Sequence, residues 1–235
     1  MLKKLYFIPP FILQGTFWWV VTYPFFRFFT RLEIRGLQNL KSVETPAIFA
    51  PNHASLLDSV LLPIALPLWS RFSPMFYLTN VYSHFRDRER FGHWSYVFRP
   101  ITFKLLGAYP TRRGKKDYSL ALVRHVQIIN DGGSVCIFPE GAVTKDGVIG
   151  SAHGGVAYLA FKTKRPVVPV LISGTYKITF DDIIYRRRKI IIEFCKPVSM
   201  DILSTAEDSD VESFKKFAEH ILQILRERQP AQNIF

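Results

Sequence analysis

Short apolar runs rich in β-branched residues alternate with stretches of helical periodicity along most of the chain. Such runs predict strands over 32–36, 47–51, 75–79, 134–138, 166–172 and 189–194. Helical patterns separate them at about 56–68, 93–106, 117–130 and 153–163. The alternation predicts an α/β domain with a central, mostly parallel or mixed sheet flanked by helices.

The last amphipathic stretch has a clear 3.6-residue period. Its apolar positions are Val211, Phe214, Phe217, Ile221, Leu222 and Leu225. Acidic residues lie at the start of this helix, and Arg226 and Arg228 lie near its C-terminal end, which suits the helix dipole. We assign the helix to packing.

The N-terminal region breaks the alternation, because residues 5–26 carry no charge. Its length just reaches the roughly 20 apolar residues that span a bilayer. Pro9 and Pro10 predict a helix that begins near residue 10, and Pro24 predicts a bend or an end. We therefore divide the chain into a membrane-associating helical segment, 1–31, and an α/β domain, 32–235.

Aromatic side chains crowd this segment, and cations flank both of its ends. This composition favours a helix lying in one leaflet, with Trp18, Trp19, Phe25 and Phe26 as its membrane contacts. A single span is the alternative. No small-x-small cleavage site follows the apolar run, which argues against a signal peptide. We expect association with the cytoplasmic face of a membrane.

The charge balance adds to this expectation. Lys and Arg number 31 against 19 for Asp and Glu, a net charge of +12, and 15% of residues are aromatic. A strongly basic chain predicts an anionic partner, and a chain this apolar favours an anionic membrane surface. Nucleic acid is less favoured, since no zinc-finger spacing or basic heptad region is present. Cys136 and Cys195 lie in apolar runs and are interpreted as buried hydrophobes in a reducing compartment.

The stretch NHASLLD (52–58) places an imidazole five residues before a carboxylate. A regular helix turns about 100° per residue, so His53 and Asp58 can meet only if His53 precedes the helix. Ser55 as N-cap, with Asp58 three residues later, fits that arrangement. His53 would then lie at the carboxyl end of a strand, where open α/β sheets place ligands. Two interpretations remain: a base oriented by a carboxylate, or a capped turn.

Two further stretches offer candidate chemistry. FPEG (138–141) holds Glu140 at the end of a predicted strand, and Gly141 permits a left-handed turn, so the carboxylate can accept from a polyol or brace an Arg. The alternative is an exposed turn Glu. GAYPTRRGKK (107–116) presents Arg112 and Arg113, which can bind a phosphate bidentately or form a solvated basic loop.

In this order, and followed by VVPV (167–170), these stretches resemble the glycerolipid acyltransferase superfamily of the lysophosphatidate acyltransferase type. The resemblance implies that His53 is the general base and Asp58 its orienting partner. It implies that Arg113, with Arg112 beside it, binds substrate, and that Glu140 and Gly141 bind the acceptor. The implied reaction transfers an acyl group from acyl-CoA or acyl carrier protein to a lysophospholipid hydroxyl, with no covalent intermediate, metal or other cofactor.

One position departs from the family pattern. The family's third motif commonly continues Gly-Thr-Arg, whereas this chain has Ala142 and Val143 after Gly141. Lys145 can supply the missing charge, as a point charge on a flexible stem. Lysophosphatidate is the expected acceptor, and a different lysolipid is the alternative. A non-catalytic lipid-binding protein and a thioesterase are further alternatives, while a serine esterase is disfavoured because no Gly-x-Ser-x-Gly elbow occurs.

Overall fold

The computed structural model describes residues 2–79, 100–111, 117–199 and 211–229. In this part of the chain a seven-stranded sheet has the order β1-β7-β6-β2-β5-β3-β4. Among the described strands, β6 and β7 pair antiparallel and the other pairs run parallel. The strands are β1 Arg31–Arg35, β2 Ile48–Pro51, β3 Met75–Thr79, β4 Ala108–Pro110, β5 Ser134–Cys136, β6 Val167–Ser173 and β7 Lys189–Phe194.

The predicted strands and the mixed α/β architecture are confirmed. The strand that the sequence did not reveal is β4, which has three residues and pairs only with β3 at the sheet edge. A run this short is too brief for the alternation that marks a strand. The central strands β2 and β5 are buried at every position, which explains their continuous apolar runs.

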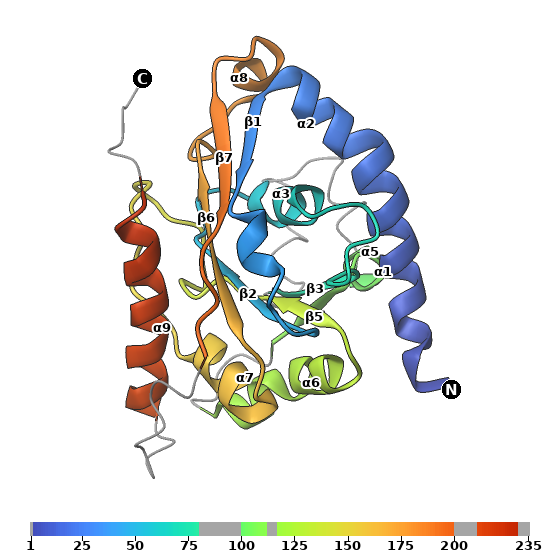
Figure 1. Ribbon diagram of the computed structural model, residues 1–235, viewed down its shortest axis with the longest axis vertical. Coiled ribbons are helices and arrows are strands. Elements are labelled where there is room, and N and C mark those ends of the chain that lie inside the picture. Colours follow the sequence, from blue (N-terminus) through green and yellow to red (C-terminus); the bar gives the residue numbers. More distant parts are fainter. Residues whose placement is uncertain (1, 80–99, 112–116, 200–210, 230–235) are drawn as a thin grey trace.

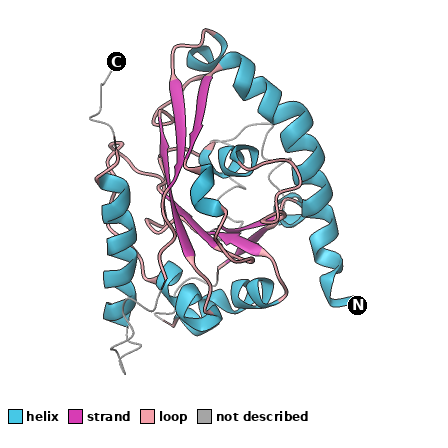
Figure 2. Cartoon of the chain, in the orientation of Figure 1, coloured by secondary structure: helices cyan, strands magenta, loops and turns pink. Residues whose placement is uncertain are grey.

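Helices cover both faces of the sheet (Figures 1 and 2). They are η3 Leu37–Leu40, α3 Asp58–Ala65, α5 Pro100–Leu105, α6 Tyr118–Asn130, α7 Gly155–Thr163, α8 Phe180–Ile184 and α9 Val211–Arg226. α3 lies on the same face as the N-terminal helices, and α6, α7 and α9 lie on the other. The short α8 was not predicted. Of the helix predicted at 93–106, residues 93–99 lie outside the described residues and α5 forms the rest.

The predicted face of α9 is confirmed as a packing surface. Its buried residues are Phe214, Phe217, Ala218, Ile221, Leu222 and Leu225. They pack against α7 and β6, and join the core on that side of the sheet. Val211, which the period included, is instead 45% exposed at the first position of the helix.

The N-terminal residues form one helical arm from Leu2 to Phe29, made of η1 Leu2–Phe7, α1 Ile8–Leu13, the π-helical η2 Gln14–Thr22 and α2 Tyr23–Phe29. The expected start of an α-helix near residue 10 is confirmed, since α1 begins at Ile8 with Pro9 and Pro10 in its first turn, and the 3-10 helix η1 precedes it. The expectation that Pro24 ends the helix is wrong, because the helix continues to Phe29. The pattern changes from π to α at Tyr23, so Pro24 lies in the first turn of α2, where its missing N–H is tolerated.

The arm turns one stripe of side chains toward the protein, and its members recur every four residues: Pro10, Gln14, Trp18, Thr22 and Phe26. A step of four residues overshoots a full α-helical turn by about 40°, and the wider π turn offsets this drift. Trp18 is 9% exposed and Phe26 4% exposed, so the expectation that they contact the membrane is wrong. Trp19 and Phe25 are partly exposed.

A polar contact fixes the arm to the sheet. The buried Gln14 amide donates to the carbonyl of Met75 at 2.6 Å and to that of Leu106 at 3.0 Å. Its oxygen accepts from the N–H of Met75 at 2.7 Å. Because this side chain satisfies backbone groups at the start of β3, it specifies where the arm sits.

Candidate active site

The site lies where the carboxyl ends of three neighbouring strands meet. β2 pairs in parallel with both β5 and β6, so the three strands end at the same edge. Asn52 and His53 follow β2, Phe138 lies two residues beyond β5, and Thr175 lies two residues beyond β6. The predicted location of His53 at the end of a strand is confirmed, and it agrees with the general rule for ligand sites in open α/β sheets.

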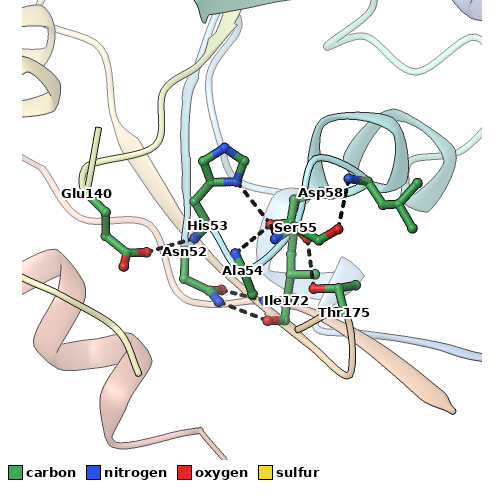
Figure 3. Close-up of polar contacts among 9 residues, drawn as sticks. Asn52, His53, Ala54, Ser55, Asp58, Glu140, Ile172 and Thr175 are labelled. Carbon is green, nitrogen blue, oxygen red and sulfur yellow. Dashed lines mark hydrogen bonds and ion pairs between the residues drawn. The ribbon is translucent and has the colours of Figure 1, made fainter. Parts of the chain in front are cut away.

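Asn52 closes the gap between β2 and β6 beyond their last paired residues. Its side-chain amide donates to the carbonyl of Ile172 at 2.9 Å, and its oxygen accepts from the N–H of Ile172 at 2.7 Å. Asn52 is 3% exposed. The side chain thus continues the hydrogen-bond ladder of the sheet and fixes the backbone immediately before His53 (Figure 3).

His53 and Asp58 are in contact across the turn that precedes α3. Nδ1 of His53 lies 3.1 Å from Oδ2 of Asp58. The carboxylate is fully buried, whereas the imidazole keeps 13% of its side-chain surface exposed. A buried carboxylate therefore faces one edge of a ring that remains partly exposed to solvent.

Several donors converge on the Asp58 carboxylate. Oδ2 also accepts from the N–H groups of Ala54 at 2.7 Å and Ser55 at 2.8 Å. Oδ1 accepts from the hydroxyl of Thr175 at 2.9 Å. These bonds hold the carboxylate in one orientation (Figure 3), so it presents a fixed acceptor to the imidazole.

The proposed helix cap at Ser55 is wrong. α3 begins at Asp58, its N-cap residue is Leu57, and no side chain caps it. The hydroxyl of Ser55 accepts from the N–H of Leu57 at 3.3 Å within the preceding turn. The carboxylate of Asp58 reaches back to the N–H groups of that turn, so the turn is closed by Asp58 itself and the helix starts there.

The environment of His53 assigns roles to its two ring nitrogens. A carboxylate accepts hydrogen bonds, so in the neutral imidazole the proton belongs on Nδ1 and the free lone pair on Nε2. The Nε2 atom points away from Asp58 (Figure 3). The ring stacks on Phe138 with centroids 3.9 Å apart and planes at 18°, which restrains the ring plane.

Glu140 acts on the backbone of the site. Its Oε1 accepts from the N–H of His53 at 2.7 Å, and its Oε2 accepts from the N–H of Gly150 at 2.9 Å. Both carboxylate oxygens thus have partners inside the protein. The structure therefore gives Glu140 a bridge between two loops, and its expected contact with a substrate hydroxyl or an Arg stays a prediction.

The carbonyl of His53 is also held, because it accepts from the N–H of Thr144 at 2.9 Å. Both backbone polar groups of His53 therefore bind the segment 138–155, which joins β5 to α7. These contacts hold the backbone of His53 from both sides.

Gly141 has φ +70, so the left-handed turn predicted at FPEG is present. A Cβ at this position would lie 2.8 Å from Cδ2 of His153. His153 is exposed, and its N–H donates to the carbonyl of Pro139 at 2.8 Å. The imidazole of His153 therefore covers Gly141 at the rim of the site.

The basic candidates are only partly placed. Arg112 and Arg113 lie outside the described residues. Lys145 is exposed, and its carbonyl accepts from the hydroxyl of Tyr176 at 2.7 Å. This bond brings the loop after β6 next to the segment that contains Ala142 and Val143.

Cys136 and Cys195 are buried free cysteines, as expected. Burial raises the pKa of the Cys136 thiol well above its usual value and the pKa of Cys195 to about 11. Thiols with raised pKa values are poor nucleophiles, so neither is a candidate for covalent catalysis.

Sequence reasoning missed Thr175, Phe138 as a ring partner, and Gly150. Thr175 had a weak signal, since it lies just beyond a predicted central strand, where site residues gather. Gly150 binds Glu140 through its backbone N–H, which nearly every residue type has, so residue type carries no signal for this contact.

Comparison with known proteins shows which family this chain resembles. A family model described as "Acyltransferase" matches residues 31–173. A chloroplastic 1-acyl-sn-glycerol-3-phosphate acyltransferase of Arabidopsis thaliana is 31% identical over 157 residues, covering 66% of this chain and 38% of that protein. A probable 1-acyl-sn-glycerol-3-phosphate acyltransferase of Mycoplasma pneumoniae is 25% identical, covering 61% of this chain and 52% of that protein. The chain thus spans about half the length of these relatives or less.

The fold also has a solved counterpart. The crystal structure of PlsC, the 1-acyl-sn-glycerophosphate (LPA) acyltransferase of Thermotoga maritima, superposes with a TM-score of 0.62 and 20% identity, covering 93% of this chain and 79% of that one. At this identity the likeness shows the fold. The matched segment 31–173 contains His53, Asp58 and Glu140 and covers more than half of the sequence. The chain belongs to the acyltransferase family.

Proposed function

We propose that this protein transfers a fatty acyl group from an acyl thioester to the free hydroxyl of a lysophospholipid, with lysophosphatidate as the preferred acceptor. The observation that carries the proposal is the pair of His53 and Asp58 at 3.1 Å, with the carboxylate fully buried and the imidazole accessible. The names of the Arabidopsis and Mycoplasma relatives support the choice of acceptor.

The geometry supports a general-base mechanism. Nε2 of His53 takes the proton of the acceptor hydroxyl while the hydroxyl oxygen attacks the thioester carbonyl. The tetrahedral intermediate then collapses, the carbon–sulfur bond breaks, and the thiolate leaves with the proton from His53. Asp58 stabilises the imidazolium that forms between these steps. General-base catalysis typically contributes about 10²–10⁴-fold, so positioning of the two substrates supplies much of the remaining rate enhancement.

The acceptor's phosphate needs cationic partners on the protein. The resemblance assigns this role to Arg113, with Arg112 beside it, and Lys145 is the described cation that follows Ala142 and Val143. Arg binds phosphate through two parallel hydrogen bonds, whereas Lys supplies a point charge. We propose that the arginines set the affinity for the phosphate and that Lys145 adds to it.

An assay of thiol release and lipid product tests the proposal. Purified protein receives one acyl-CoA, or one acyl carrier protein thioester, and lysolipids that differ only in head group. We expect thiol release that depends on lysophosphatidate and yields phosphatidate, and we expect His53→Ala to abolish it while remaining folded. Thiol release without acceptor would indicate a thioesterase, and vesicle binding without turnover would indicate a lipid-binding protein. Either result contradicts the proposal.

We also propose that the helical arm lies in one leaflet of the membrane. Leu5–Phe29 is long and apolar enough to span a bilayer. However, the arm packs along the α/β domain through α3, β3, α5 and β1, and Gln14 fixes it to β3. A helix attached along its length cannot cross the bilayer without bringing the polar domain into the hydrocarbon. Its exposed apolar residues are Leu5, Ile8, Phe11, Ile12, Phe17, Val20, Val21 and Phe28.

The end of the arm near α8 has the composition of a membrane interface. Phe28 is 66% exposed on α2, and Phe180 and Tyr185 are 69% and 66% exposed on and beside the neighbouring α8. The guanidinium of Arg187 lies 5.1 Å from the centroid of the Tyr185 ring. Exposed aromatic rings beside arginines suit the level of anionic lipid head groups.

A further inference from the structure

Two side chains of α9 hold the main chain of the segment that carries Glu140. Nε of Arg226 donates to the carbonyl of Ile149 at 3.3 Å, and its Nη2 donates to the carbonyl of Gly150. Oε2 of Glu219 accepts from the N–H of Ala152 at 3.0 Å. The two side chains therefore hold residues 149–152 from one helix.

Arg226 and Glu219 also bind each other, with Nη1 and Oε1 2.6 Å apart. Their side chains are 29% and 46% exposed, and exposed ion pairs contribute little to stability. The pair therefore does little for folding by itself. Its effect is to orient both side chains toward the same loop.

The held loop is directly connected to the catalytic histidine. Both backbone polar groups of Gly150 are bound, because its carbonyl accepts from Arg226 and its N–H donates to Glu140 at 2.9 Å. The other oxygen of Glu140 accepts from the N–H of His53 at 2.7 Å. A continuous path of hydrogen bonds thus runs from α9 through Gly150 and Glu140 to the backbone of His53.

We propose that Arg226 and Glu219 are positioning residues for the acyl transfer, acting on His53 through Gly150 and Glu140. The inference rests on the proposed function. α9 lies beyond the matched residues 31–173, and its buried apolar face attaches it to α7 and β6. α9, which the sequence assigned to packing, therefore has a second role: it holds residues 149–152 in place relative to His53.

The expected effect follows from the sensitivity of catalysis to geometry. A displacement of about 1 Å in a catalytic group can cost about 10²-fold in rate. We expect Arg226→Ala to lower kcat by about 10- to 100-fold and Glu219→Gln by less, since Gln keeps one acceptor oxygen. The KM for the acyl thioester should change little, because both side chains bind backbone groups of residues 149–152 and neither is a candidate substrate-binding residue.

Arg228→Ala is the matched control. Arg228 lies two residues further on, and pairs with Glu193 at 3.5 Å. Its substitution removes the same charge next to the same helix without touching residues 149–152. We expect wild-type kcat for this variant, and thermal unfolding midpoints that differ little among all three variants. An equal loss of kcat in Arg228→Ala would overturn the proposal.

A double-mutant cycle separates positioning from a general loss of stability. If Arg226 acts through Glu140, then adding Arg226→Ala to Glu140→Gln should lower kcat by less than about threefold more. Independent, multiplicative losses would show that Arg226 acts elsewhere and would overturn the proposal. The failure of the proposed function has a different signature, since wild-type protein would then give no lysolipid product at all.

Discussion

The hydroxyl of Thr175 donates to Oδ1 of Asp58 at 2.9 Å, and both side chains are completely buried. This bond joins the loop after β6 to the first residue of α3, across 117 residues of sequence. The other oxygen of Asp58 faces the imidazole of His53. Thr175 therefore fixes the rotation of the carboxylate that orients the base.

Thr175→Val should lower both stability and activity. The substitution keeps the shape but leaves one buried carboxylate oxygen without its donor, at a cost of about 1–3 kcal/mol. The freed carboxylate can rotate, so we expect kcat to fall by about tenfold. Urea unfolding and the thiol-release assay measure the two effects. Thr175→Ser keeps the hydroxyl and should restore most of kcat, and a Ser variant as impaired as the Val variant would contradict this role.

Gly141→Ala should impair the rim of the site. Alanine at φ +70 costs about 1–2 kcal/mol, and its Cβ would displace the ring of His153. We expect a lowered kcat/KM for the lysolipid. Gly132→Ala is the control, because Gly132 also has a positive φ, +98, but a Cβ there would meet nothing within 4 Å. Lysolipid kinetics that respond equally to both substitutions would argue against a role for the Gly141 surface.

Val20→Glu should weaken binding to vesicles that contain anionic lipid. Val20 is 73% exposed on the outer face of the arm, and a carboxylate there opposes insertion among lipid tails. We expect the vesicle partition coefficient to fall by about tenfold or more, corresponding to about 1.4 kcal/mol or more. Val123→Glu introduces the same charge at an exposed valine of α6 and should have little effect. The reverse ranking in vesicle cosedimentation would place the membrane on the α6 side.

Cysteine labelling distinguishes a helix in one leaflet from a span. Lys4→Cys and Arg27→Cys place reactive thiols at the two charged ends of the apolar run, at the level of the aqueous head groups, and both native cysteines are buried. On protein bound to sealed vesicles, we expect an impermeant reagent added outside to label both positions. Protection of one end until the vesicles are opened would indicate a span.

His125 should make the protein less stable in mild acid. Burial lowers the pKa of His125 to about 4, below the value near 6.5 of an unfolded chain. The unfolded chain therefore binds the proton first, so this contribution to stability is complete above pH 6.5 and is lost as the pH falls toward 4. The loss is on the order of 3 kcal/mol. In His125→Gln, urea midpoints measured between pH 7 and 4 should fall less steeply than in the wild type.

Local patterns were enough to predict much of this molecule. The strands at 47–51 and 166–172 are recognisable because a strand buried on both faces must be apolar at every position. The spacing of His53 and Asp58 was informative for a similar reason, since helix geometry allows them to meet only across a helix start. The apolar face of α9 followed from its period.

Other features depend on which segments meet. The arm is apolar all round, so its composition did not reveal which side faces the core, and Trp18 and Phe26 were assigned to the wrong side. Glu140 was recognisable as a site residue, but its partners are backbone N–H groups of His53 and Gly150, which nearly every residue type can offer.

The sequence by itself determined the α/β class, the positions of most strands along the chain and the residue types at the site, because these depend on spacing along the chain. The tertiary structure alone decided that Thr175 orients Asp58, that Arg226 holds the backbone of Ile149 and Gly150, and that one stripe of the arm is buried. These contacts join residues distant in sequence, and only the packing of the sheet and its helices brings them together.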